Sequence, residues 1–138
     1  MYQKILLASD GSEHALRAAD HAFSLASLQK DAQVDIIYVV DTKHAKEDVI
    51  HHWGEDTSVL RKQRMSMFEQ KAQYHNVPYE LTFLHGEPGP TIVKHANHHD
   101  YDIVVIGSRG LNVLQEMVLG SVSHKVAKRV NCPVLIIK

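Results

Sequence analysis

The chain has 138 residues, of which 44% are hydrophobic and 22% are charged, and its formal net charge is −1 with a pI near 6.8. This size suits a single globular core, so we expect one domain over residues 1–138. A nearly neutral chain has no electrostatic footprint for nucleic acid or an anionic membrane surface, and neither partner is expected.

Cysteine content and apolar run lengths indicate the compartment. Cys132 has no second cysteine with which to form an internal disulfide. The first apolar run, residues 5–8, is too short for the core of a signal peptide. No run approaches the roughly 18 apolar residues that a transmembrane helix needs. We therefore expect a soluble, cytoplasmic protein.

Five short apolar runs predict five strands. They lie at residues 5–8, 36–40, 79–84, 103–106 and 134–137. Four of the runs are nearly continuous, which is typical of strands buried on both faces in a parallel sheet covered by helices. In the run 79–84, Glu80 and Thr82 interrupt the apolar residues, which favours an edge strand.

Helical periodicity fills the intervals between these runs. Ser12 is a candidate N-cap for a first helix, whose inward positions are Ala15, Ala19, Ala22, Phe23 and Ala26. A second helix is expected over residues 57–75, with Met65, Phe68 and Ala72 on one face. A third follows Gly89-Pro90, with Ile92, Val93 and Ala96 inward, and a fourth starts near Ser121 and buries Val122, Val126 and Val130. The alternation predicts an α/β fold with a doubly wound parallel sheet between helices.

Residues 41–56 fit no regular element. The segment is polar, rich in lysine and histidine, and contains Trp53, the single tryptophan. It is interpreted either as a mobile flap over a ligand or as a solvated excursion with one packed aromatic side chain.

Residues with phosphate-binding chemistry gather where the predicted strands end. Ligands of an open α/β sheet bind beyond the carboxyl ends of its strands, here at residues 9–11, 39–41 and 107–110. Glycines 107 and 110 allow a ligand close to the backbone. Residues 120–123 place amides and hydroxyls at a helix N-terminus, where the dipole favours anions. Turn chemistry and tight packing are the alternative explanation for each residue alone.

The same residues resemble the universal stress protein family. The spacing Gly107, two residues, Gly110, nine residues, Gly120-Ser121 is similar to the family's nucleotide-binding signature. Residues 4–12, 39–41, 86–88 and 131–137 resemble, in order, its first strand and turn, the end of its second strand, the turn before its third helix and its last strand. The resemblance covers the whole chain.

The resemblance implies a Rossmann-like fold of the adenine nucleotide alpha hydrolase type, with strand order 3-2-1-4-5, and ATP binding. It puts Asp10 near the adenosine, the backbone around Val39 at the adenine, and Gly107, Arg109 and Gly110 along the ribose and phosphates. The phosphates would be held at the helix start. The predicted nucleotide-binding residues are Ser9, Asp10, Val39, Gly107, Arg109, Gly110, Gly120, Ser121, Val122 and Ser123. Mg²⁺ or Mn²⁺ is expected to accompany the triphosphate, without a metal site of the protein's own.

The resemblance also places the last strand at the sheet edge. That strand is the apolar run Val134, Leu135, Ile136 and Ile137. Because an uncovered apolar edge invites aggregation, we expect a homodimer that pairs this strand with its two-fold mate.

Histidines 95, 98 and 99 have a spacing that could bring imidazoles onto one helical face. Asn97 and Asp100 indicate an exposed helix end there. A structural zinc site is therefore not expected.

Three motifs of well-known enzyme classes are absent from the sequence. It contains neither G-x-x-x-x-G-K-[ST] nor G-x-G-x-x-G, and no G-x-S-x-G. The signature offers amides, hydroxyls and one cation, Arg109, with no catalytic residue, which favours a nucleotide-binding regulatory module of the stress response. The alternatives are a slow ATPase or ATP-dependent nucleotidyl or phosphoryl transferase, with Glu116 as its acid, and a dimeric stress scaffold that binds nucleotide incidentally.

Overall fold

The computed structural model describes residues 1–10, 13–40, 57–109 and 119–138. Their elements, in chain order, are β1 (Lys4–Ser9), α1 (Glu13–Ser27), β2 (Gln33–Val40), α3 (Thr57–His75), β3 (Tyr79–His85), α4 (Pro88–His98), β4 (Ile103–Gly107), α5 (Ser121–Arg129) and β5 (Val134–Ile137). Every predicted strand is confirmed. Most are longer than the apolar runs, because backbone pairing includes polar residues such as Lys4 opposite Gln33.

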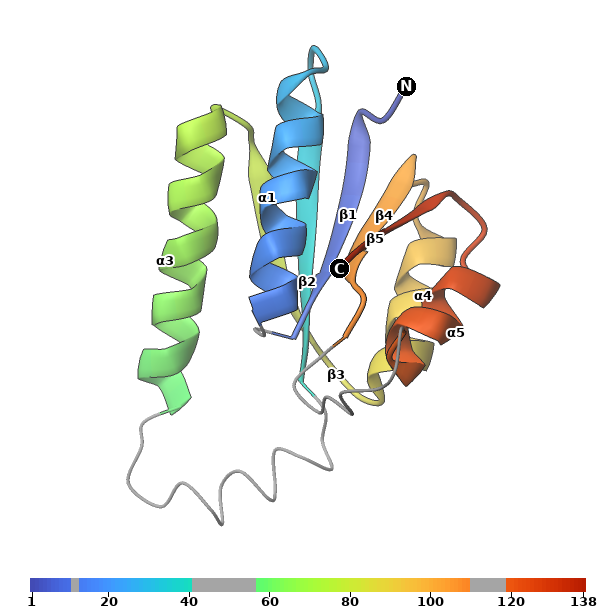
Figure 1. Ribbon diagram of the computed structural model, residues 1–138. Coiled ribbons are helices and arrows are strands. Elements are labelled where there is room, and N and C mark those ends of the chain that lie inside the picture. Colours follow the sequence, from blue (N-terminus) through green and yellow to red (C-terminus); the bar gives the residue numbers. More distant parts are fainter. Residues whose placement is uncertain (11–12, 41–56, 110–118) are drawn as a thin grey trace.

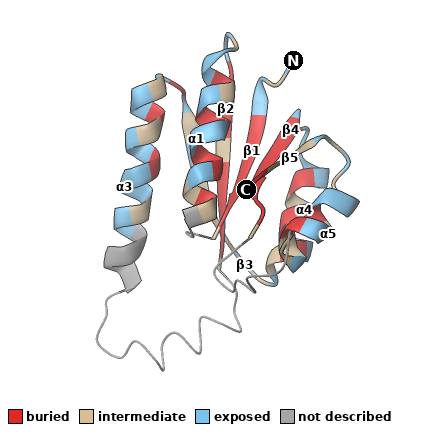
Figure 2. Cartoon of the chain, in the orientation of Figure 1, coloured by how far each residue is buried: buried red, intermediate tan, exposed pale blue. Residues whose placement is uncertain are grey.

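The five strands form one parallel sheet in the order β3-β2-β1-β4-β5, as expected (Figure 1). β1 lies at its centre and pairs with β2 on one side and β4 on the other; Leu7 is opposite both Ile36 and Val105. All residues of β4 and all but the first of β1 are buried, which confirms burial on both faces for the central strands (Figure 2).

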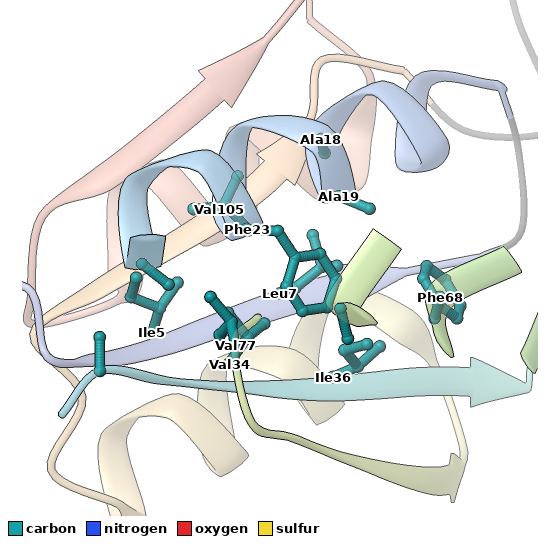
Figure 3. Packing of buried hydrophobic residues seen from close by; sticks show 14 of the residues in the cluster. Ile5, Leu7, Ala18, Ala19, Phe23, Val34, Ile36, Phe68, Val77 and Val105 are labelled. Atoms are coloured by element: carbon teal, nitrogen blue, oxygen red, sulfur yellow. The ribbon is translucent and has the colours of Figure 1, made fainter. Parts of the chain in front are cut away.

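Helices cover both faces of the sheet: α1 and α3 lie on one side, and α4 and α5 on the other (Figure 1). Because successive side chains of a strand point to opposite faces, β1 contributes to two cores. Ile5 and Leu7 pack with Phe23 and Phe68 beneath α1 and α3 (Figure 3). The second core, beneath α4 and α5, contains Leu6, Ala8, Ile37, Val39, Ile92, Val104 and Val126.

The predicted inward positions of α1 are confirmed, since all five are buried. In α3, Phe68 and Ala72 are buried as predicted, but Met65 is 40% exposed, so its assignment to the inner face is wrong. The inward-facing residues of α3 lie four positions apart, and before Phe68 this spacing leads to Arg64, which is half-buried. These residues form the inner stripe of α3. α3 lies beside α1 toward the edge of the sheet, so only a narrow stripe meets the core (Figure 2).

The two edge strands differ in polarity. β3 alternates half-buried and exposed residues, and Glu80 and Thr82 are exposed, which confirms the predicted edge strand. β5 forms the other edge, and its predicted burial on both faces is wrong: Leu135 is 36% exposed and Val134 and Ile136 are half-buried. The reason is that β5 has a neighbouring strand, β4, on one side only.

α4 begins at Pro88, so Gly89 and Pro90 lie inside its first turn and not before it. The turn that precedes it requires a glycine, because Gly86 has φ +146°, a conformation that L side chains rarely adopt. No helix in the described part of the chain is long and apolar enough to cross a membrane.

Candidate functional site

The helices that follow β1 and β4 in the chain lie on opposite faces of the sheet. β1 leads to α1 on one face, whereas β4 leads to α5 on the other, and the two strands are neighbours (Figure 1). A crevice opens at such a switch point and is where open α/β sheets bind ligands. The site residues predicted from the sequence come from the ends of β1, β2 and β4 and from the start of α5.

On the β4 side, hydrogen bonds connect the strand end to the start of α5. Ser108 N donates to the Ile137 carbonyl at 2.7 Å, and Gly120 N donates to the Ser108 carbonyl at 2.7 Å. The Ser123 hydroxyl donates to the Gly107 carbonyl at 2.6 Å. Ser108 and Ser123 are only 2% and 3% exposed. The first turn of α5 is therefore held against the end of β4.

Among the residues that the structure describes, no side chain caps the amino end of α5. Gly120 is the N-cap and its carbonyl accepts a hydrogen bond from His124 N at 3.0 Å. The amides of residues 121–123 have no carbonyl partner within the helix, as in any first turn, and they carry the positive end of the dipole. Of the predicted phosphate-holding hydroxyls, Ser121 is exposed, whereas Ser123 donates its proton inward to Gly107.

The two signature glycines that the structure describes serve different purposes. A Cβ on Gly107 would lie 2.9 Å from the Cβ of His14 and 3.0 Å from its carbonyl carbon. Gly107 thus allows α1 to approach β4, a packing role that supports the structural alternative for this residue. A Cβ on Gly120 would meet only ordinary contacts at 3.4 and 3.6 Å, and its φ of −68° suits any residue.

On the β1 side, Ser9 is buried and Asp10 is half-buried. The Tyr38 hydroxyl donates to the Asp10 carbonyl at 3.1 Å, and Arg64 Nη1 donates to the Tyr38 hydroxyl oxygen. Sequence reasoning missed Tyr38 and Arg64. The alternation of β2 places Tyr38 beside the predicted Val39, but no local signal connects it with a residue 26 positions later in another helix.

The backbone of Val39 faces the β1 side. Val40 accepts a hydrogen bond from Gly86 N at 3.1 Å, so its backbone groups face β3. Those of Val39 point the opposite way, because successive residues of a strand alternate. The pairing between β1 and β2 ends at Ser9 and Tyr38. The Val39 side chain is itself 5% exposed, within the α4/α5 core.

The carboxyl edge therefore gathers most of the predicted set. Arg109 and Val122 are half-buried there, and Val122 packs on the α4/α5 core. Gly110 lies outside the described residues, as do Ser12, Glu116 and the segment 41–56 with Trp53.

A second polar cluster lies at the opposite, amino edge of the sheet. The Tyr101 hydroxyl donates to Asp35 Oδ2 at 3.0 Å and lies 3.2 Å from His95 Nε2, and Lys4 Nζ is 4.9 Å from the Tyr101 ring centre. The His95 and His99 rings stack at 4.2 Å. Burial and the nearby Asp35 carboxylate raise the Tyr101 pKa well above its usual value, and burial and His99 lower the His95 pKa.

Histidines 95, 98 and 99 do not converge on one point. His99 Nδ1 hydrogen-bonds to the His95 carbonyl at 2.8 Å, and His98 is exposed. Among the residues that the structure describes, no three histidine, cysteine, aspartate or glutamate side chains are arranged to hold a metal ion.

Comparison with known proteins identifies the family. A model of the universal stress protein family matches residues 1–138. Universal stress protein YxiE of Bacillus subtilis is 36% identical over 149 residues and 100% of each chain. The solved structure of MJ0577 from Methanocaldococcus jannaschii superposes with a TM-score of 0.84 at 31% identity, covering 100% of this chain and 96% of that one. A universal stress protein solved in complex with cAMP is 27% identical, with a TM-score of 0.70 over 99% of this chain and 97% of that one. The chain belongs to the universal stress protein family.

Proposed function

We propose that this protein binds an adenine nucleotide, ATP with Mg²⁺ or Mn²⁺, in the crevice between the ends of β1 and β4, and that the bound state is its regulatory output in a stress response. The observation that carries the proposal is the uncapped start of α5, held by Gly120 and Ser108 at the switch point. A helix N-terminus in this position suits a phosphate group. The relative in complex with cAMP supports an adenine nucleotide as the ligand class.

Phosphates would be bound by the amides of residues 120–123, with the Arg109 guanidinium beside them. Arginine donors match phosphate oxygens in geometry and charge. In the predicted set, Asp10 is the single acid. The divalent ion would therefore be held mainly by the triphosphate and water, as is usual for magnesium.

The adenosine would lie toward β1 and β2. The backbone of Val39 faces the β1 side where the strand pairing ends, and Asp10 follows the last paired residue of β1. Backbone groups at this point have a geometry suited to the polar edge of a base. In this arrangement Gly107 serves the packing of α1 on β4, and Gly110 remains a predicted contact of the nucleotide.

The test compares two substitutions of Ser121, which is exposed at the first position of α5. Ser121→Glu places a carboxylate where it favours the helix dipole but repels phosphate, so we expect affinity for Mg-ATP to fall by at least about tenfold with no loss of stability. Ser121→Gln is the neutral control and retains affinity. Isothermal titration calorimetry gives the dissociation constants. Equal affinities in the two variants would contradict phosphate binding at this helix end.

Nucleotide is also expected to stabilise the parent. With a dissociation constant on the order of 10 μM, about 1 mM Mg-ATP adds about 2.7 kcal/mol to the free energy of unfolding, enough to raise the midpoint by several degrees. Mass spectrometry of the small molecules released on denaturing the purified protein would identify the nucleotide that it carries. If none of ATP, ADP, AMP and cAMP raised the unfolding midpoint, the proposal would be refuted.

The homodimer is proposed to form through β5. This edge strand is entirely apolar, whereas the opposite edge strand, β3, carries the exposed charged residue Glu80, and a charge on an edge strand disfavours pairing. Leu135→Lys should shift sedimentation to the monomer, and Thr82→Lys should not. Leu135 is the better target because Ile137 is 7% exposed and packs in the α1/α3 core, where lysine would unfold the chain. If the Leu135→Lys variant remained a dimer, the interface would lie elsewhere on the molecule.

We propose that the protein binds ATP without hydrolysing it rapidly. Amides that hold the ground-state phosphate as well as the transition state do not accelerate hydrolysis. We therefore expect any hydrolysis to be slower than the range of about 1–100 per second typical of kinases. Single-turnover assays on the parent and Glu116→Gln measure this. Rapid turnover that collapses in the variant would favour the enzyme alternative.

A further inference from the structure

A chain of hydrogen bonds joins α3 to the candidate site. Arg64 occupies the inner stripe of α3, four residues before the fully buried Phe68. Its guanidinium donates to the Tyr38 hydroxyl, which in turn donates to the Asp10 carbonyl at 3.1 Å. Three segments far apart in the sequence thus meet at the end of β1.

The direction of this chain is set by chemistry. A guanidinium is always protonated and has no acceptor, so the Tyr38 oxygen accepts from Arg64. The single hydroxyl proton of Tyr38 is then directed to the Asp10 carbonyl. A charged donor at the start of such a chain strengthens the next bond. Arg64 therefore both orients and polarises the Tyr38 hydroxyl.

Packing holds the Tyr38 ring in place. The residue is 8% exposed and its ring contacts Phe83, with centroids 5.6 Å apart. Its ring position therefore does not depend on the hydroxyl. The hydroxyl adds one thing, a fixed direction for the Asp10 carbonyl, which restrains the backbone at the point where β1 ends.

We propose that Tyr38, oriented by Arg64, is a positioning residue for the nucleotide. This inference rests on the nucleotide binding proposed above. By holding the Asp10 carbonyl on the α1/α3 side, the Tyr38 hydroxyl preorganises the β1 end of the crevice before the ligand arrives. Binding then costs less ordering of this backbone, so affinity is higher. Arg64 acts through Tyr38, not by touching the ligand.

The first test removes one hydroxyl at a time. Tyr38→Phe keeps the ring and should raise the dissociation constant for Mg-ATP about fivefold, the equivalent of one ordinary hydrogen bond. Tyr101→Phe is the matched control, because Tyr101 is also 8% exposed and also donates a hydrogen bond, but at the amino edge of the sheet. It should lower the unfolding midpoint without changing the dissociation constant. An equal loss of affinity in both variants would overturn the inference.

The second test is a double-mutant cycle. Arg64→Leu should weaken binding by a smaller factor than Tyr38→Phe, and Arg64→Lys, which keeps a charged donor, should restore part of the loss. The double variant Arg64→Leu/Tyr38→Phe should bind like Tyr38→Phe alone, because Arg64 acts through the hydroxyl. Additive losses would mean that Arg64 acts on the ligand directly and would overturn the positioning role.

The outcomes separate this inference from the proposed function. If the parent binds Mg-ATP and Tyr38→Phe binds equally tightly, the positioning role is refuted and nucleotide binding stands. If the parent binds no adenine nucleotide, both fall. Should Tyr38→Phe fold poorly, the ratio of dissociation constants for Arg64→Leu and Arg64→Lys decides, and a ratio of one refutes the inference.

Discussion

Two tyrosines of equal burial lie at opposite ends of the sheet, Tyr101 at the amino edge, where the strands begin, and Tyr38 at the carboxyl edge, where they end. At the amino edge, the Tyr101 hydroxyl bonds to side chains, Asp35 and His95, and Lys4 lies over its ring. At the carboxyl edge, the Tyr38 hydroxyl accepts a hydrogen bond from the Arg64 side chain and donates its own proton to main chain, the Asp10 carbonyl. The amino edge is a network of side chains that satisfy one another. The carboxyl edge uses side chains to restrain the backbone, and no side chain of the described residues caps the first turn of α5.

Protonation states at the amino edge support this difference. Burial, with Asp35 nearby, raises the Tyr101 pKa, which keeps its hydroxyl a donor. Burial and His99 lower the His95 pKa, which favours the neutral ring near Lys4. Each shift favours a protonation state that is compatible with the observed hydrogen bonds. We infer that the amino edge serves stability and the carboxyl edge serves binding.

The largest expected effect separates packing from binding at the carboxyl edge. Gly107→Ala places a Cβ against the Cβ and backbone of His14, which cannot retreat without moving α1. We expect a loss of about 1–3 kcal/mol in the free energy of unfolding, measured by denaturant titration.

Gly120→Ala is the matched control, because its Cβ meets only ordinary contacts. It should leave stability nearly unchanged and weaken nucleotide binding. Equal destabilisation by the two substitutions would contradict the separate roles of these glycines.

A smaller effect is expected from Tyr101→Phe at the amino edge. The substitution removes one donor from the half-buried Asp35, which keeps a hydrogen bond from Gln33 Nε2 at 2.6 Å. The free energy of unfolding should fall by about 1 kcal/mol. A loss of nucleotide affinity in this variant would contradict the separate roles inferred for the amino and carboxyl edges.

The smallest effect is a pH dependence from His95. Its pKa is lowered in the folded chain from the ordinary value of 6.5, so the unfolded chain takes up the proton first as the pH falls. The neutral ring's contribution to stability is fully present above pH 6.5 and is lost as the pH falls through the lowered folded pKa.

His95→Gln should therefore flatten the decline in stability as the pH falls below 6.5, measured by thermal melts. His98→Gln, at an exposed position on the same helix, is the control and should leave the decline in stability unchanged. Identical pH profiles for the parent and His95→Gln would show that another group governs the decline.

Local patterns were sufficient for most of the architecture. Apolar runs located all five strands, and the three- and four-residue spacing located the inner face of α1, because a strand and a helix each repeat over a few residues. The candidate site was predicted from the same kind of local signal, since glycines and serines after a strand are neighbours in the chain. The family resemblance added the strand order.

The tertiary structure decided which residues of one helix or strand contact those of another. The spacing of α3 suited Met65 as well as Arg64, and the narrow contact of that helix with the core selected Arg64. Gly107 was predicted to admit a ligand, but its missing Cβ admits α1.

The link from Arg64 through Tyr38 to Asp10 spans separations of 26 and 28 residues. A short-range period carries no information over such distances. The sequence by itself determined the elements and the chemistry at their ends, because both are properties of neighbouring residues. The fold alone decided which side chains meet, because that depends on how the helices pack on the sheet.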